Sequence, residues 1–134
     1  MPKRRGSRLT MLAGLASAAA MVGLVMPSSA QAAAAGPAAW SCPIGHVCFY
    51  TGDNGTGQVC EWSQDDRDWR SGEIVCSWSS STRAQSVRNR GTSGRPVSYY
   101  TGTDYTGWAG CTNSGTQVNF PGSGYYLRSH TWAC

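Results

Sequence analysis

The sequence predicts a small all-β domain, built from antiparallel strands and stapled by disulfides. Short runs of β-branched and aromatic residues alternate with clusters of Gly, Asn, Asp and Thr, a composition typical of strands joined by tight turns. The chain has 6 Cys, and one pattern of eleven residues occurs twice. No stretch after residue 40 offers three turns of helical periodicity. We therefore expect one disulfide-stapled β-sandwich made of two related halves.

Residues 1–32 are predicted to be a cleaved export signal. A cationic start precedes an apolar, Ala-rich stretch at 9–25 and a small-x-small pattern that ends at Ala32. The stretch is shorter than the ~20 residues of a membrane-spanning helix, which favours cleavage over anchoring. Cleavage removes four cations, so seven Arg then balance seven Asp and Glu. This balance argues against nucleic-acid binding and against binding to a membrane surface.

The exported part is expected to begin with a flexible leader, residues 33–39, and to fold as a monomer from residue 40 to residue 134. Its first half is expected at about 40–92 and its second at about 93–134. Seven strands are predicted, at residues 47–50, 58–62, 73–78, 86–88, 96–100, 116–120 and 125–130. Turn clusters separate them, at residues 51–57, 89–94, 101–107 and 121–124.

All the cysteines lie in the exported part, and their even number predicts three disulfides in an extracellular protein. The sequence leaves the connectivity open, and we expect neighbours along the chain to pair. The expected pairs are Cys42 with Cys48, Cys60 with Cys76, and Cys111 with Cys134.

The internal repeat aligns residues 47–57 with residues 97–107 without gaps, and six of the eleven positions are identical. In each copy an aromatic residue stands seven positions before a glycine, and a serine follows later near a predicted strand. A period near fifty residues, with about four strands in each unit, fits two Greek-key motifs.

This pattern of an aromatic residue, a glycine and a strand serine resembles the motif of βγ-crystallin-type Greek-key domains. In that motif the aromatic ring packs over a folded hairpin, the glycine adopts a conformation forbidden to other residues, and the serine hydroxyl ties the hairpin down. The resemblance assigns these roles to Tyr50, Gly57 and Ser86 in the first half, and to Tyr100, Gly107 and Ser129 in the second.

Three segments together resemble the Streptomyces-type metalloproteinase inhibitor family. They are the opening Ser-Cys-Pro-Ile-Gly-His-Val-Cys-Phe-Tyr at 41–50, Ser-Val-Arg-Asn-Arg-Gly-Thr at 86–92, and the second aromatic-x6-Gly pattern. The resemblance covers residues 41–132. It implies a secreted inhibitor that blocks the active-site cleft of an extracellular metallopeptidase with a rigid loop and needs no cofactor.

Alignment to this family places the inhibitory segment after the second hairpin, at Gly110, Cys111, Thr112, Asn113 and Ser114. Two features depart from the family pattern. The next cysteine is Cys134 rather than one a few residues on, and Thr112 is small and polar, whereas thermolysin-like enzymes have a bulky apolar pocket. A bulky apolar residue in place of Thr112 is therefore expected to strengthen inhibition.

Catalytic and metal chemistry find little support in the sequence. There is no Gly-x-Ser-x-Gly elbow, and the 2 His, His46 and His130, are far apart and lack a paired acid motif, so we expect neither an enzyme nor a zinc site. The carboxylates at 65, 66 and 68 alternate with Arg67 and Arg70 and are expected to form local ion pairs in a solvated loop. An arginine stands in each segment where related domains carry a calcium signature, so no calcium is expected.

The aromatic residues, 6 Trp, 6 Tyr and 2 Phe, are more than a domain of this size can bury. Those expected in hairpins and core are Tyr50, Trp78, Tyr99, Tyr100 and Trp132. Trp62, Trp69 and Trp108 lie beside turns or charges and are candidates for a recognition surface. Two alternative functions therefore stay open, a killer-toxin-like antimicrobial protein of the same fold and an aromatic-faced module that binds carbohydrate or cell wall.

Overall fold

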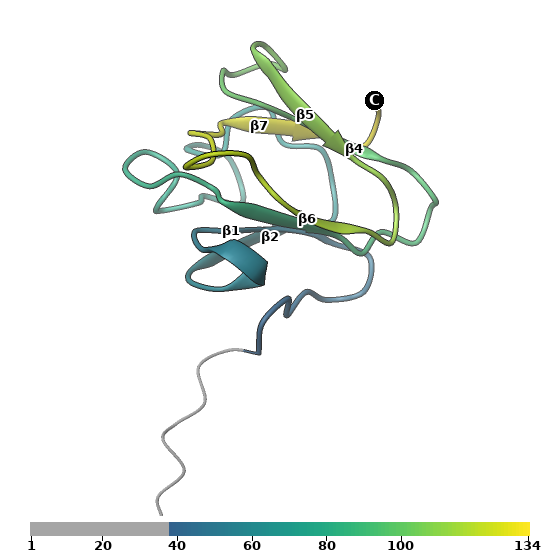
Figure 1. The fold of residues 1–134 in the computed structure, drawn as a ribbon. Helices are drawn as coiled ribbons and strands as arrows, with labels where there is room; N and C mark the ends of the chain where they lie inside the picture. Colours follow the sequence, from purple (N-terminus) through teal and green to yellow (C-terminus); the bar gives the residue numbers. More distant parts are fainter. Residues whose placement is uncertain (1–37) are drawn as a thin grey trace, which may run out of the picture. The chain divides into compact units, whose positions relative to one another are not determined.

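Two antiparallel sheets face each other in the part of the chain that the structure, a computed structural model, describes, residues 38–134 (Figure 1). The first sheet has the order β2-β1-β3-β6 and the second the order β5-β4-β7. The first contains β1 (Val47–Tyr50), β2 (Val59–Trp62), β3 (Ser86–Asn89) and β6 (Gln117–Asn119), and the second contains β4 (Val97–Tyr100), β5 (Trp108–Thr112) and β7 (Ser129–Thr131). A 3-10 turn, η1, spans Asp53–Gly55. The prediction of an all-β domain is confirmed.

The predicted export signal and residues 33–37 of the predicted leader lie outside the described residues. Among residues 38–134, no helix reaches the length and apolarity that crossing a bilayer requires.

One strand of the second half belongs to the first sheet. β6, from the second half, pairs with β3 of the first half, with Val118 opposite Val87. In return, Asp66 of the first half forms an isolated antiparallel bridge with His130 of β7. The first sheet therefore contains strands of both halves, whereas all three strands of the second sheet come from the second half. The crystallin-type Greek key remains a prediction.

In the first hairpin the serine hydroxyl lies where it can hold the turn. Ser86 Oγ accepts a hydrogen bond from the Gly55 N–H at 3.0 Å and donates one to the Gly52 carbonyl at 2.7 Å. Gly57 has a φ of 81°, in the left-handed region that side chains disfavour. The Tyr50 ring packs edge-on against Trp40, with 5.7 Å between ring centroids, and its hydroxyl donates to the Ser41 carbonyl at 2.7 Å.

The second hairpin repeats this geometry fifty residues later. Ser129 Oγ accepts from the Tyr105 N–H at 3.2 Å and donates to the Gly102 carbonyl at 2.7 Å. Gly107 has a φ of 70°, and Tyr105, at the position of Gly55, has a φ of 62°. The repeated sequence pattern thus corresponds to a repeated backbone conformation.

One predicted strand does not form, and one strand of the structure is not among those predicted. Residues 73–78 form bends and turns rather than a strand, because no other strand lies alongside them and β-propensity requires such a neighbour. β5 was not predicted, because Ala109 and Gly110 have low strand propensity. It forms because β4 pairs with it, and Gly110 is needed there, since a Cβ would lie 2.8 Å from the Tyr99 ring. The strand predicted at 125–130 is shorter and later than expected, at Ser129–Thr131.

The core between the sheets is largely aromatic. The Phe49 ring lies 4.7 Å from Trp69, 5.7 Å from Tyr99 and 6.1 Å from Trp62, measured between ring centroids. Trp62 and Trp69 stack at 4.5 Å. Three disulfides join Cys42 to Cys48, Cys60 to Cys76 and Cys111 to Cys134, as the pairing of chain neighbours predicts, and no free cysteine occurs among the described residues.

Candidate functional site

The predicted inhibitory segment runs from edge strand β5 into the turn that leads to β6. Gly110, Cys111 and Thr112 belong to β5, whereas Asn113 and Ser114 begin the turn. Cys111 is exposed and bonded to Cys134. Thr112 is only 2% exposed, and its hydroxyl lies 3.2 Å from the hydroxyl of buried Tyr99. The segment therefore presents its backbone and the side chains on either side of Thr112, while Thr112 anchors it from within.

Asn89, at the end of β3, holds this segment in place. Its side-chain amide donates to the Thr112 carbonyl at 3.1 Å and to the Arg95 carbonyl at 3.0 Å. Its Oδ1 accepts from the Gly91 N–H at 3.0 Å, and the side chain is fully buried. One asparagine therefore joins β3, the segment after it and the end of β5.

The turn after Thr112 is also tied down by backbone hydrogen bonds. The Thr116 N–H and hydroxyl both donate to the Asn113 carbonyl, at 3.2 and 2.7 Å. The Asn89 N–H donates to the Thr116 carbonyl at 2.9 Å, and the Asn89 carbonyl accepts from the Gly115 N–H at 3.0 Å. Asn113, Gly115 and Thr116 are nevertheless exposed. The result is a rigid turn with an accessible outer surface.

A family model described as peptidase inhibitor family I36, the family of the Streptomyces metalloproteinase inhibitor, matches residues 35–112. This match covers more than half of the chain. The chain belongs to peptidase inhibitor family I36. The family resemblance indicated by the sequence motifs is thereby confirmed, and the protein is an inhibitor of peptidases rather than an enzyme. A search of curated proteins found no match.

The geometry around Thr112 changes one expectation for the inhibitor. Because the side chain is buried beside Tyr99, it cannot enter a peptidase pocket while the fold is intact, and a larger residue would have to displace core atoms. A bulky apolar residue at this position is therefore not expected to strengthen inhibition.

Instead, Thr112→Leu is expected to lower the free energy of unfolding by about 1 to 3 kcal/mol, through overpacking and loss of the contact with Tyr99. Urea denaturation would measure this change. The matched control is Asn113→Leu, which places the same side chain at the exposed neighbour and should change stability by less than about 0.5 kcal/mol. Equal stabilities for the two variants would contradict the buried placement of Thr112.

The three tryptophans proposed as a recognition surface do not form one. Trp62 and Trp69 stack inside the core of the inhibitor, and only Trp108 is accessible, with 65% of its surface exposed. The prediction for Trp62 and Trp69 is wrong because β2 pairs with β1 and both rings pack against Phe49 in the core. Of the aromatics expected inside, Tyr50, Trp78 and Tyr99 are buried, and Tyr100 and Trp132 are partly buried.

The acidic loop forms ion pairs, but its partners lie far along the chain, so the prediction of local pairing with Arg67 and Arg70 is wrong. The Asp68 carboxylate accepts from Arg128 Nε at 3.0 Å and from Arg128 Nη2 at 3.3 Å. The hydrogen bonds from Arg128 hold the pKa of Asp68 below its usual value. Arg67 Nη2 lies 2.7 Å from Asp104 Oδ1 on the surface. Within residues 38–134, no three potential metal-ligating side chains of His, Cys, Asp or Glu gather.

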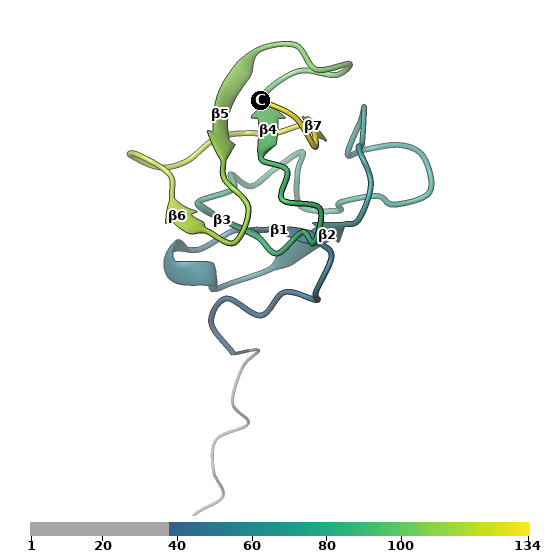
Figure 2. The ribbon, with the colours of Figure 1, turned by 90° about the vertical axis from the view of Figure 1, so that its right-hand side faces the viewer.

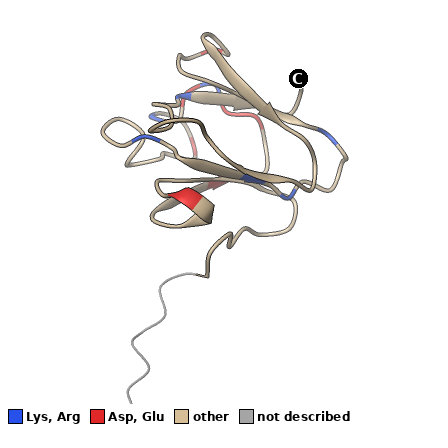
Figure 3. Cartoon of the chain, in the orientation of Figure 1, with Lys and Arg blue, Asp and Glu red and all other residues tan. Residues whose placement is uncertain are grey.

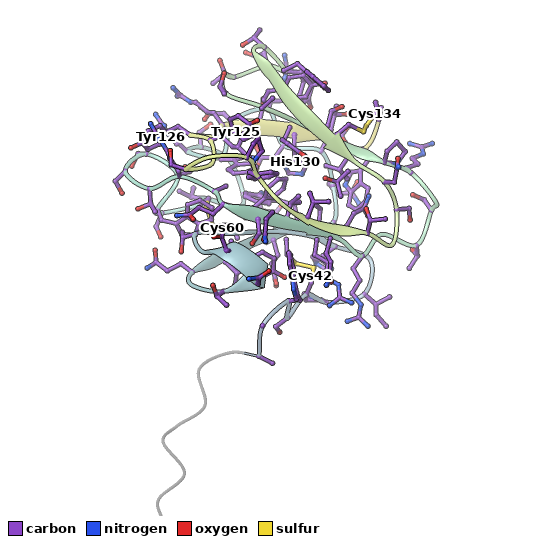
Figure 4. The ribbon with its side chains drawn as sticks, viewed as in Figure 1. Cys42, Cys60, Tyr125, Tyr126, His130 and Cys134 are labelled. Atoms are coloured by element: carbon purple, nitrogen blue, oxygen red, sulfur yellow. A yellow bond between two sulfur atoms is a disulfide. The ribbon has the colours of Figure 1, made fainter. Side chains whose placement is uncertain are left out.

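His130 lies inside the molecule, as Figure 4 shows, and is fully buried. Its Nδ1 accepts from the Trp69 indole N–H at 2.8 Å, and its Nε2 lies 2.9 Å from the Gln64 carbonyl. Nε2 therefore carries the proton of a neutral ring. Burial lowers the pKa of His130 to about 4.

Sequence reasoning missed the roles of Asn89 and His130. The sequence places Asn89 in a turn cluster. An asparagine at the end of a strand is nevertheless a signal, because its side chain can form hydrogen bonds with neighbouring backbone groups. Nothing in the sequence signals the contact between Trp69 and His130, because the two residues are 61 positions apart.

Proposed function

We propose that this member of the family is exported and inhibits an extracellular metallopeptidase, as a monomer, by placing residues 110–114 in the active-site cleft. The observation that carries the proposal is the anchoring of this exposed segment by buried Asn89. A loop already held in its bound shape loses little conformational freedom on binding, so more of the contact energy contributes to affinity.

The disulfide between Cys111 and Cys134 supports the same proposal. If the peptidase hydrolyses a bond just after Cys111, the two new ends stay attached through this disulfide. The Asn89 hydrogen bonds also keep the Thr112 carbonyl near its original place. A cut loop held in this way dissociates slowly, which is how a cleavable segment can still act as an inhibitor.

The alternative functions have less support. Arg and acidic residues are interspersed over the described chain, as Figure 3 shows, whereas a toxin that binds an anionic surface would concentrate its cations. The aromatic face required for wall binding is reduced to Trp108, since Trp62 and Trp69 are buried.

The test is a titration of a thermolysin-like metallopeptidase and of a subtilisin-like serine peptidase with the purified protein. We expect stoichiometric loss of the metallopeptidase activity. Asn113→Glu, which adds a charge at the exposed turn, should weaken inhibition about tenfold or more. The matched control is Gln58→Glu, the same charge at an exposed position before β2, which should leave inhibition unchanged.

Three outcomes would contradict parts of this proposal. Loss of only the serine peptidase activity would contradict the target class. Loss of neither activity would contradict inhibition of these peptidases. Inhibition that Asn113→Glu leaves intact would contradict the assigned segment alone.

A further inference from the structure

A second exposed loop, residues 70–75, has the features of an inhibitory loop. All six residues are exposed, whereas the flanking Trp69 and Cys76 are buried. Ile74 is 44% exposed and Val75 is 57% exposed, so the loop presents two adjacent β-branched apolar side chains to solvent. Such a pair contributes little to the core and is accessible to a partner.

The end of this loop is fixed by a disulfide and by the backbone. The Cys76 N–H donates to the Trp69 carbonyl at 2.7 Å, which closes the loop across its base. Cys76 is bonded to Cys60, which lies in β2. The apolar pair therefore directly precedes a residue that is covalently held to the first sheet.

The start of the loop is fixed by Asp68. Its Oδ1 accepts from the Arg70 N–H at 3.1 Å, and its carbonyl accepts from the Ser71 N–H at 3.0 Å. Arg128 holds the Asp68 carboxylate, and Arg70 Nη2 donates to the Ser79 carbonyl at 3.2 Å. Both ends of the loop are thus attached to the folded domain, while its middle is free to make contacts.

A hollow of about 400 Å³ lies beside the loop. Gly72, Glu73 and Ile74 line one wall, and residues 62–67 line the other. In Figure 2 the chain between β2 and β3, which includes this loop, projects on the right of the domain, whereas β5 and β6 lie on its left. The loop is therefore separate from the segment at residues 110–114.

We propose that residues 70–75 are a second peptidase-binding loop, which inserts Ile74 into the bulky apolar pocket of a metallopeptidase. Unlike Thr112, Ile74 offers an exposed aliphatic side chain. Its loop ends at Cys76, which a disulfide fixes to the first sheet. This inference takes its target class, an extracellular metallopeptidase, from the proposed function, but it assigns a different binding loop.

The bond presented to the enzyme is the amide between Glu73 and Ile74. Slow hydrolysis adds one water across it and leaves a carboxylate on Glu73 and an amine on Ile74. The two pieces remain joined through the disulfide between Cys60 and Cys76. The cut chain is therefore heavier by one water and separates only after reduction.

The test uses the purified protein and thermolysin. Ile74→Asp is expected to weaken inhibition about 30-fold or more, because a charge replaces the side chain that fills the pocket. The matched control is Ile44→Asp, the same change at a residue that is 69% exposed, which should change inhibition by less than about threefold. After long incubation, mass spectrometry of the reduced protein should show a fragment that begins at Ile74. An unchanged circular dichroism spectrum would show that each variant is folded.

The outcomes separate this inference from the proposed function. If Ile74→Asp inhibits as well as the unmodified protein, or if the cut falls within residues 110–114, the inference is overturned and the proposed function stands. If inhibition is lost in Ile74→Asp but kept in Asn113→Glu, the second loop is supported and the assigned segment is overturned. An unmodified protein that inhibits no metallopeptidase would overturn both.

Discussion

Asn89→Ala is expected to lower the free energy of unfolding by about 2 to 4 kcal/mol. The change removes three hydrogen bonds of the buried side chain, to the Thr112 and Arg95 carbonyls and from the Gly91 N–H. A buried polar group that loses its partner costs about 1 to 3 kcal/mol, and the groups nearer the surface cost less because water can replace the side chain. Urea denaturation at neutral pH would measure the loss.

Two further variants test the cause of this effect. Asn89→Asp has nearly the same shape but places a buried carboxylate oxygen against two carbonyls, so we expect a loss of at least about 3 kcal/mol. Asn119→Ala removes an exposed asparagine that bonds to Asn54, and the loss should be below about 1 kcal/mol. A tolerated Asn89→Asp would show that the amide does not hold the Thr112 carbonyl.

The same variants connect stability with function. Where Asn89→Ala remains folded at the assay temperature, the turn after Thr112 loses its internal support, and ordering it again on binding requires free energy. If residues 110–114 are the inhibitory segment, inhibition should weaken about tenfold. An unchanged inhibition constant for this folded variant would count against that segment and in favour of the loop at residues 70–75.

The second large effect is a loss of stability in mild acid, caused by His130. Its pKa falls to about 4 in the folded protein, against the ordinary value of 6.5 in the unfolded chain. Below pH 6.5 the unfolded state binds a proton that the folded state excludes, so protonation favours unfolding. Each pKa unit corresponds to about 1.4 kcal/mol, which predicts a loss of about 3 kcal/mol between pH 7 and pH 4.

The physical reason lies in the surroundings of the ring. Burial removes the water that would stabilise an imidazolium, and protonation of Nδ1 would leave the Trp69 indole N–H without its acceptor. The pH range also separates His130 from Asp68, because the hydrogen bonds from Arg128 hold the pKa of Asp68 below its usual value and its contribution is therefore lost only in stronger acid.

Urea denaturation at several pH values between 7 and 4 would measure this loss, with two histidine variants as controls. His130→Gln lacks the titrating ring, so its stability, although lower at pH 7, should depend much less on pH in this range. His46→Gln keeps the buried ring and should keep the loss. A stability of the unmodified protein that stays constant from pH 7 to pH 4.5 would contradict the buried neutral state of His130.

The sequence by itself determined the features that depend on residues close together along the chain. The all-β class follows from short runs between turn clusters. The two hairpins follow from the repeat, because left-handed glycines and a hydroxyl at a set position define each turn locally. The disulfides join chain neighbours, and the family follows from short motifs. Each of these depends on chemistry that a few adjacent residues carry.

Only the tertiary structure decided which side chains face the interior. Thr112 and Ile74 show the difference most clearly. The small polar Thr112 is buried because β4 and Asn89 surround it, whereas the apolar Ile74 is exposed because no strand lies beside its loop. His130 meets Trp62 and Trp69 because the chain at Asp66 pairs with His130 of β7. Burial depends on the partners that distant parts of the chain supply, and hydrophobicity and local propensity contain no information about those partners.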